Sequence, residues 1–288
     1  MIPGVLGGSI LNPDFFETLR TDLIEGRLYL PPMPEVARRI RDCASDPEAS
    51  AADLAKLISA DPTLSGRLLH VANSPYFRGL KPVESVQAAV SRLGMVCVRN
   101  LVTSLVMGAL FDEIATPAIR RPLREAWEYA TRVAAYSFVI ARRFTRLSPD
   151  EAMLAGLMHN IGIAPILIRA SKDSHRMARF QDLLDAADRN HASIGALVAE
   201  LWALPPKVAI AIAEHEDLTR RTPGLPDLTD VVCVANLHCR LGSRHRLARV
   251  DWSAVPAFAR LQLTPEQSIA AMREARAQIA EMQQLLQH

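Results

Sequence analysis

Aromatic residues, lysines, cysteines and net charge are all scarce in this 288-residue chain. Aromatics make up 5% of the sequence while apolar residues together make up 49%, so Leu, Ala, Val and Ile must fill the core. The formal net charge of +2 excludes the broad positive field of a general nucleic-acid binder. The four cysteines show no C-x-x-C spacing, which argues against a zinc or redox motif and favours reduced thiols in the core.

Long uncharged apolar runs are also missing. No apolar segment reaches membrane-spanning length without a charged residue, and the N-terminus lacks the basic segment of a signal peptide. Helices expected at 50–59 and 63–73 have the order of a helix-turn-helix, but the second is too apolar to read bases. We therefore expect a soluble cytoplasmic protein that binds neither membrane nor nucleic acid.

The sequence does contain a long series of helix signals. Alanine is abundant, strand-like alternation is almost absent, and apolar residues recur at helical spacing, so we predict an all-α fold. Ser50, Asp61 and Ser85 are expected helix caps, and Gly94 is an expected helix stop. The expected helices cover about 12–25, 35–44, 50–59, 63–73, 85–93, 96–110, 123–144, 149–158, 163–169, 177–188, 194–202, 206–214, 228–241 and a last segment from 264.

The last expected helix begins at Thr264, where Thr-Pro-Glu-Gln resembles a capping box. Its charged surface is interrupted by one apolar stripe, formed by Ile269, Met272, Ile279, Met282 and Leu286. An amphipathic helix has to cover such a stripe. We therefore expect it to dock either on the body of the protein or on a second subunit.

The most informative motif is Gly-Leu-Met-His-Asn-Ile-Gly at residues 156–162. In it, His159 ends an expected helix and is followed by Asn160 rather than by an acid. A carboxylate gives negative charge to a divalent cation, whereas an amide offers only a weak carbonyl dipole. The motif therefore keeps the imidazole of a metal-binding pair and lacks its charge.

Together with other segments, this motif resembles the HDOD family, the HD-related output domain of bacterial signalling proteins. The resemblance is carried by residues 30–34, 58–62, 68–77, 91–94, Trp127, 156–162, His191, 202–205 and 214–216, and it spans about 28–241. It implies two packed helical subdomains, the second an HD-like core related to HD and HD-GYP phosphohydrolases. The implied division is an N-terminal helical extension, a first HDOD part, an HD-like part and a C-terminal amphipathic helix, at 1–27, 28–118, 119–260 and 261–288.

The resemblance also implies where a metal site would lie. Enzymatic relatives hold one metal with an early His, an adjacent His-Asp pair and a late Asp. These positions fall at Tyr129, at His159 and Asn160, and at Asn236, so only His159 matches. A phenol with a pKa near ~10 is a poor ligand at neutral pH, and neither amide supplies charge.

HD-GYP relatives add a downstream His and a His-His pair for further metals. His191 matches the first, and Glu214 with His215 matches the pair, while residues 220–225 replace the Gly-Tyr-Pro signature. We expect these histidines to be inherited core residues, with no metal, no cofactor and no catalytic residue. The alternative is a single surviving metal held by His159, His191, Glu214 and His215.

The function implied by the family is non-enzymatic regulation in signal transduction through protein–protein interaction. Other signalling proteins are the expected partners, and a homo-oligomer is possible on this view. Two alternatives stay open: a metal-dependent phosphohydrolase that uses the residual histidines, and a nucleotide sensor that holds phosphates with arginines from 120–146 or 240–249.

Overall fold

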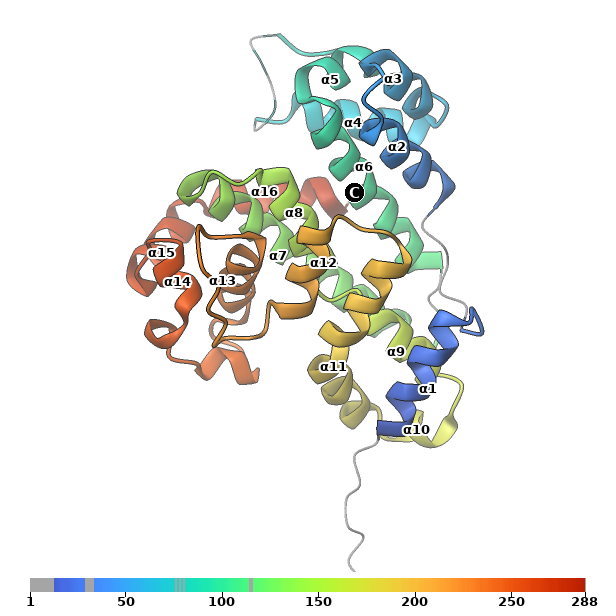
Figure 1. The fold of residues 1–288 in the computed structure, drawn as a ribbon, viewed down its shortest axis with the longest axis vertical. Helices are drawn as coiled ribbons and strands as arrows, with labels where there is room; N and C mark the ends of the chain where they lie inside the picture. The colour runs from blue at the N-terminus through green and yellow to red at the C-terminus, as the bar shows by residue number, and fades with distance from the viewer. Residues whose placement is uncertain are drawn as a thin grey trace, which may run out of the picture.

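The computed structural model describes residues 13–28, 34–75, 77, 79, 81–113 and 116–287, with side chains over the same ranges except 13 and 107–113. Within these residues every regular element is a helix, which confirms the all-α prediction. The helices form two packed groups joined by one long helix (Figure 1). Of the family motifs, residues 30–33 and Tyr76 lie outside the described residues.

The first group lies at the top of Figure 1 and consists of α2 (Glu35–Ser45), α3 (Ala51–Ser59), α4 (Pro62–Asn73), α5 (Val86–Leu93) and the start of α6 (Met95–Glu113). Ser50 forms a capping box with Asp53, and Asp61 and Ser85 cap α4 and α5 by accepting backbone N–H groups. Gly94 follows α5 at φ +82°, a left-handed conformation that favours glycine. The predicted caps and stop are confirmed.

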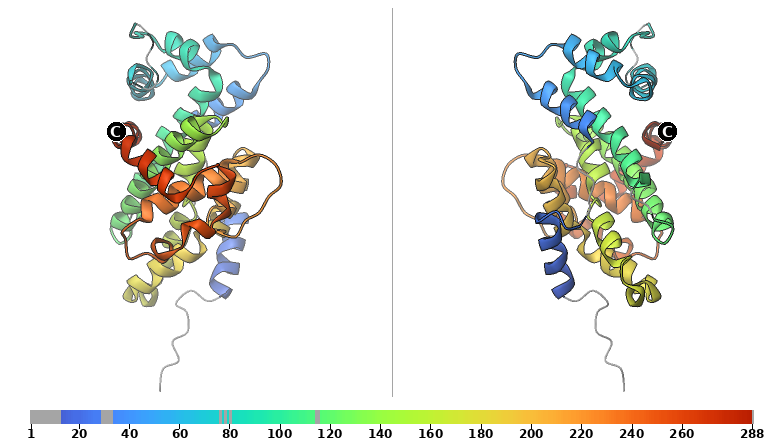
Figure 2. Two further views of the ribbon diagram at one scale, coloured as in Figure 1. Left: turned by 90° about the vertical axis from the view of Figure 1, so that its left-hand side faces the viewer. Right: turned by 90° about the vertical axis from the view of Figure 1, so that its right-hand side faces the viewer.

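The second group consists of α7 (Arg120–Phe144), α8 (Pro149–Met158), α9 (Ile163–Ala170), α10 (Ser174–Ala178), α11 (Phe180–Leu201), α12 (Pro206–Glu214) and α13 (Leu228–Arg240). Helix α7 packs along α8 and α13, and α6 continues from the first group onto α7 and α8. Helix α1 (Pro13–Ile24) packs on α9 and α11, where Asp22 pairs with Arg169 at 3.0 Å. Figure 2 shows α1 beside this second group, away from the first.

One helical stretch, Pro149–Ala170, is long and apolar enough to cross a membrane. Helix α5 and the first part of α6 pass the same test as a pair, but they are bent by 114° relative to each other. In Pro149–Ala170, 83% of the apolar window is buried inside the protein, which is typical of a core helix.

The prediction of two helices at 177–188 and 194–202 is wrong. The structure has the short α10 and then one continuous helix, α11, through the polar stretch between the two expected segments. The side chain of Asn190 donates to the carbonyl of Ala186 at 2.7 Å, and Ser193 donates to the carbonyl of Asn190 at 3.0 Å. Because these polar side chains bond to the helix itself, the polarity does not break it.

The C-terminal region also differs in detail from the prediction. It contains two short 3₁₀ helices and three α-helices: η1 (Arg246–Arg249), η2 (Trp252–Ala254), α14 (Pro256–Arg260), α15 (Pro265–Glu274) and α16 (Arg276–Gln287). The capping box at Thr264 is confirmed, but the single helix expected after it breaks at Ala275. This break lets α16 lie along α7 and α6 with Ile279, Met282 and Leu286 buried. The apolar stripe therefore docks on the body of the protein.

His238 of α13 connects this C-terminal region to the core. Its Nε2 lies 2.7 Å from the hydroxyl of Ser268 in α15, and its ring packs between Tyr136 and Trp252. Burial lowers the pKa of His238 from 6.5 to about 4. Between these two pH values the unfolded chain binds a proton at His238 that the folded protein does not bind.

We expect the stability of the protein to fall as the pH drops from 6.5 towards 4, because the unfolded state binds more protons in this window. A difference of this size corresponds to about 3 kcal/mol. Urea denaturation at several pH values should show this loss for the wild type and a smaller loss for His238→Gln. The two proteins should differ least in pH dependence above pH 7, where the imidazole is neutral in both states. If the wild type and His238→Gln lost the same amount of stability down to pH 4, His238 would not be the group responsible.

Candidate functional site

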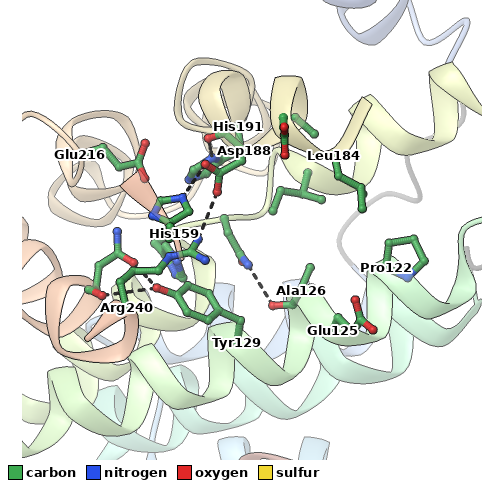
Figure 3. Close-up of a pocket in the computed structure, with 16 residues that line it drawn as sticks. Pro122, Glu125, Ala126, Tyr129, His159, Leu184, Asp188, His191, Glu216 and Arg240 are labelled. Atoms are coloured by element: carbon green, nitrogen blue, oxygen red, sulfur yellow. Dashed lines mark hydrogen bonds and ion pairs between the residues drawn. The ribbon is translucent and has the colours of Figure 1, made fainter. Parts of the chain in front are cut away.

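A cavity of about 340 Å³ lies in the second helical group. Its wall is formed by side chains from α7, the junction of α8 and α9, α11, the end of α12 and the end of α13 (Figure 3). Tyr129, His159, Asn160, His191 and Asn236 all line it. Positions that are far apart in the sequence therefore meet at one cavity.

Three buried imidazoles lie close together at this site, and two of them, His159 and His191, line the cavity. His159 directly follows α8, His191 lies in α11 and His215 directly follows α12. Nε2 of His191 lies 3.2 Å from Nε2 of His215. The ring of His159 is nearly perpendicular to both, with its centroid 5.0 Å from that of His215 and 6.3 Å from that of His191.

The hydrogen bonds of the three rings fix their tautomers. In each ring Nδ1 contacts the backbone carbonyl three residues earlier, at 2.6 Å for His159, 2.6 Å for His191 and 2.9 Å for His215. A carbonyl only accepts, so Nδ1 carries the proton and Nε2 of the neutral ring carries a lone pair. Burial lowers the pKa of His191, lowers that of His159 well below 6.5, and lowers that of His215 to about 3. At neutral pH all three rings are uncharged.

The neutral residues at the other predicted positions bond within the protein. The amide of Asn160 donates to the carbonyl of Ala126 in α7 at 2.9 Å. The phenol of Tyr129 donates to the side-chain oxygen of Asn236. Burial raises the pKa of Tyr129 well above 10, so the phenol stays protonated. These three side chains offer the cavity no negative charge.

Arg240, which belongs to the basic segment 240–249, lines the cavity. Its guanidinium lies 4.1 Å from the centre of the Tyr129 ring and donates to Asp188 at 3.1 Å, between the two in Figure 3. The second oxygen of Asp188 accepts from Nε2 of His245 at 2.7 Å. Burial alone would raise the pKa of Asp188, but the His245 hydrogen bond and the Arg240 charge lower it to about 2. Asp188 is therefore ionised and paired.

The structure corrects the acidic position of the site from Glu214 to Glu216. Glu214 is half exposed and pairs with Arg220 at 2.6 Å, and it does not line the cavity. Glu216, two residues later, does line the cavity. Ligand atoms of His191, His215 and Glu216 lie within 4.8 Å of one another. Helix α12 ends at Glu214, so the turn that follows it decides which glutamate faces inward.

Two of the missed residues had a signal in the sequence. Asp188 lies three residues before His191 in one helix, a spacing that brings them to one face. Glu216 directly follows His215 within the motif 214–216. Neither signal distinguishes a cavity-lining residue from a surface residue, because that depends on packing between α11, α12 and α13.

Comparison with known proteins agrees with this fold. The chain is 23% identical to a candidate metal-dependent phosphohydrolase from Shewanella amazonensis, with a TM-score of 0.77 over 95% of this chain and 98% of that one. It is 23% identical to an HDOD domain protein of unknown function from Geobacter sulfurreducens, with a TM-score of 0.70 over 96% and 98%. These likenesses show a shared helical fold.

A curated relative, an uncharacterised protein of Treponema pallidum, is 28% identical over 225 residues. The match covers 73% of this chain and 42% of the relative, so this chain spans less than half of the relative's length. The HDOD domain matches residues 30–218, which include α7, α8, α11 and α12 of the site but not α13. The chain belongs to the HDOD family.

Proposed function

We propose that this chain is a non-enzymatic module of signal transduction that acts by binding other proteins. The observation that supports the proposal is the neutral set of Tyr129, Asn160 and Asn236 at the positions where enzymatic relatives carry ligands. Metal-assisted hydrolysis requires an activated water and charge compensation beside it. Removing two carboxylates takes away much of that compensation.

Arg240 provides a second argument that the chain is not an enzyme. Its guanidinium brings a fixed positive charge into the cavity and engages Asp188, the nearby carboxylate. A phosphohydrolase that clamps a substrate between metal ions needs such carboxylates free for the metals. Arg240 and Asp188 instead hold helices α13 and α11 together.

A metal-dependent phosphohydrolase is the second candidate function. It is favoured by the close grouping of the His159, His191 and His215 rings. Four-coordinate metal sites with three histidines are catalytic when water fills the fourth position. The charge argument above ranks this candidate below the first, and a rate measurement separates the two.

The interaction proposal is tested by crosslinking in living cells. A tagged copy of the chain is expected to enrich one or more signalling proteins over an equally expressed, unrelated tagged helical protein. A second copy of this chain in the crosslinked product would identify a homo-oligomer. If no signalling protein is enriched under any growth condition and deletion of the gene has no phenotype, the proposal is wrong.

A further inference from the structure

We propose that His191, His215 and Glu216 bind one divalent transition-metal ion of the zinc type. This inference goes beyond the proposed function, because such an ion can hold helices together in a protein without enzymatic activity. It also replaces the expectation of a metal-free cluster, and it uses Glu216 where the sequence pointed to Glu214.

The first argument is the contact between His191 and His215. Both Nδ1 atoms donate to backbone carbonyls, so both Nε2 atoms of the neutral rings carry lone pairs. The two Nε2 atoms lie 3.2 Å apart. Two lone pairs at this distance repel each other unless a cation lies beside both. The geometry therefore requires an electrophile at this point, either a metal ion or a proton.

The second argument is the distance itself. Histidine nitrogens that are bound about 2.0–2.1 Å from one tetrahedral zinc ion lie about 3.3 Å from each other. The observed 3.2 Å between the two Nε2 atoms is close to this value. The ligand atoms of His159 lie outside the group that is within 4.8 Å, so a water molecule would fill the fourth position of a tetrahedral ion.

The third argument is the carboxylate. One oxygen of Glu216, Oε2, pairs with Arg246, and the other, Oε1, is buried with no hydrogen-bond partner among the residues that the structure describes. A buried carboxylate oxygen without a partner is costly. A ligand atom of Glu216 lies within 4.8 Å of those of His191 and His215, so an ion between them would be within reach of this carboxylate.

The chemistry of the donors identifies the class of ion. Two imidazoles and one carboxylate, with water as a fourth ligand, are a ligand set for zinc and similar transition metals, whereas magnesium and calcium prefer oxygen ligands. The backbone carbonyls that accept Nδ1–H act as the outer partners that orient ligating histidines. Asp188 is not part of the set, because Arg240 and His245 occupy its two oxygens.

The test is metal binding by the full chain after removal of metal with a chelator. Elemental analysis after dialysis against zinc should give one equivalent per chain, and zinc should raise the melting temperature. Cobalt in place of zinc should give the intense visible absorption of a four-coordinate ion. A proton between His191 and His215 in place of a metal would leave no bound ion and no such spectrum, and that result would overturn the proposal.

Two matched variants test which of two glutamates is the carboxylate ligand of the metal. Glu216→Gln keeps the size of the side chain and should weaken zinc binding at least about 100-fold, the upper end of what loss of an outer partner costs. Glu214→Gln, two residues away and paired outward with Arg220, should bind zinc like the wild type. Circular dichroism of both variants without metal checks that they fold. Equal affinity in the two variants, or a loss confined to Glu214→Gln, would contradict the proposed ligand set.

Discussion

Replacing Gly162 with alanine is expected to cost at least about 3 kcal/mol of stability, because the new methyl group has no space. A Cβ built on Gly162 would lie 2.1 Å from the carbonyl oxygen of His191 and 2.5 Å from the backbone nitrogen of Gly195. Both are backbone atoms of α11, so no side chain can rotate to relieve the clash. The start of α9 and the middle of α11 would have to separate, which would also displace His191.

Gly66 provides the matched control. A Cβ at this position meets nothing within 4 Å, and Gly66 lies inside α4. Gly66→Ala should therefore raise stability by up to about 1 kcal/mol, because alanine favours a helix more than glycine does. Urea denaturation of both variants measures the two effects. A Gly162→Ala protein as stable as the wild type would show that α9 and α11 are not packed as the structure has them.

Replacing Arg260 with methionine is expected to cost about 3–5 kcal/mol, because it leaves a buried carboxylate without its main partner. Arg260 of α14 contacts both oxygens of Asp230, at 3.0 and 2.9 Å, and donates to the carbonyls of Thr222 and Leu225. Asp230 is 2% exposed, and Arg220 reaches it only at 3.7 Å. Arg260 thus fixes the loop that occupies the place of the Gly-Tyr-Pro signature.

Two further variants separate charge from geometry at this position. Arg260→Lys keeps the charge but not the planar fork, and it should lose an intermediate amount of stability. Asp230→Asn in the Arg260→Met background should recover part of the loss, because it removes the unpaired charge. Burial raises the pKa of Asp230 above 3.8, and loss of Arg260 would raise it further. The cost of Arg260→Met should therefore shrink as the pH falls towards 5, and a cost that is independent of pH would contradict this explanation.

Local signals predicted the helices well. The bounds of α8 and α12 agree with the prediction, and so do the caps at Ser50, Asp61 and Ser85, because each depends on residues a few positions apart. The break expected within α11 was wrong, since nothing local reveals that polar side chains will bond to their own helix. The positions of the four parts of the chain, 1–27, 28–118, 119–260 and 261–288, stay a prediction.

The sequence predicted only those residues of the site that belong to recognisable motifs. His159 and His191 line the cavity, and Nε2 of His215 lies 3.2 Å from Nε2 of His191. Glu216 and Arg240 could not be found in the same way, because the turn after α12 and the last turn of α13 aim these side chains. Whether a charged side chain faces a cavity or the solvent is decided by contacts between helices, and the sequence does not state these contacts directly.

Two proposals are combined here: the protein binds a metal ion through buried imidazoles, and it does not hydrolyse substrate because acidic ligands are missing. The proposed metal ligands His191, His215 and Glu216 have ligand atoms within 4.8 Å of one another, while Asn160 and Asn236 carry no negative charge. A metal ion in such a site would join α11 to the turn that follows α12. Binding of an ion and absence of hydrolysis are therefore compatible, and each is measured separately.

The most direct test is the initial rate of phosphodiester hydrolysis by protein saturated with zinc, manganese or iron. The account predicts a rate equal to that of the same metal without protein, for the wild type and for His191→Ala. A rate that rises with bound metal in the wild type and returns to background in His191→Ala would contradict it.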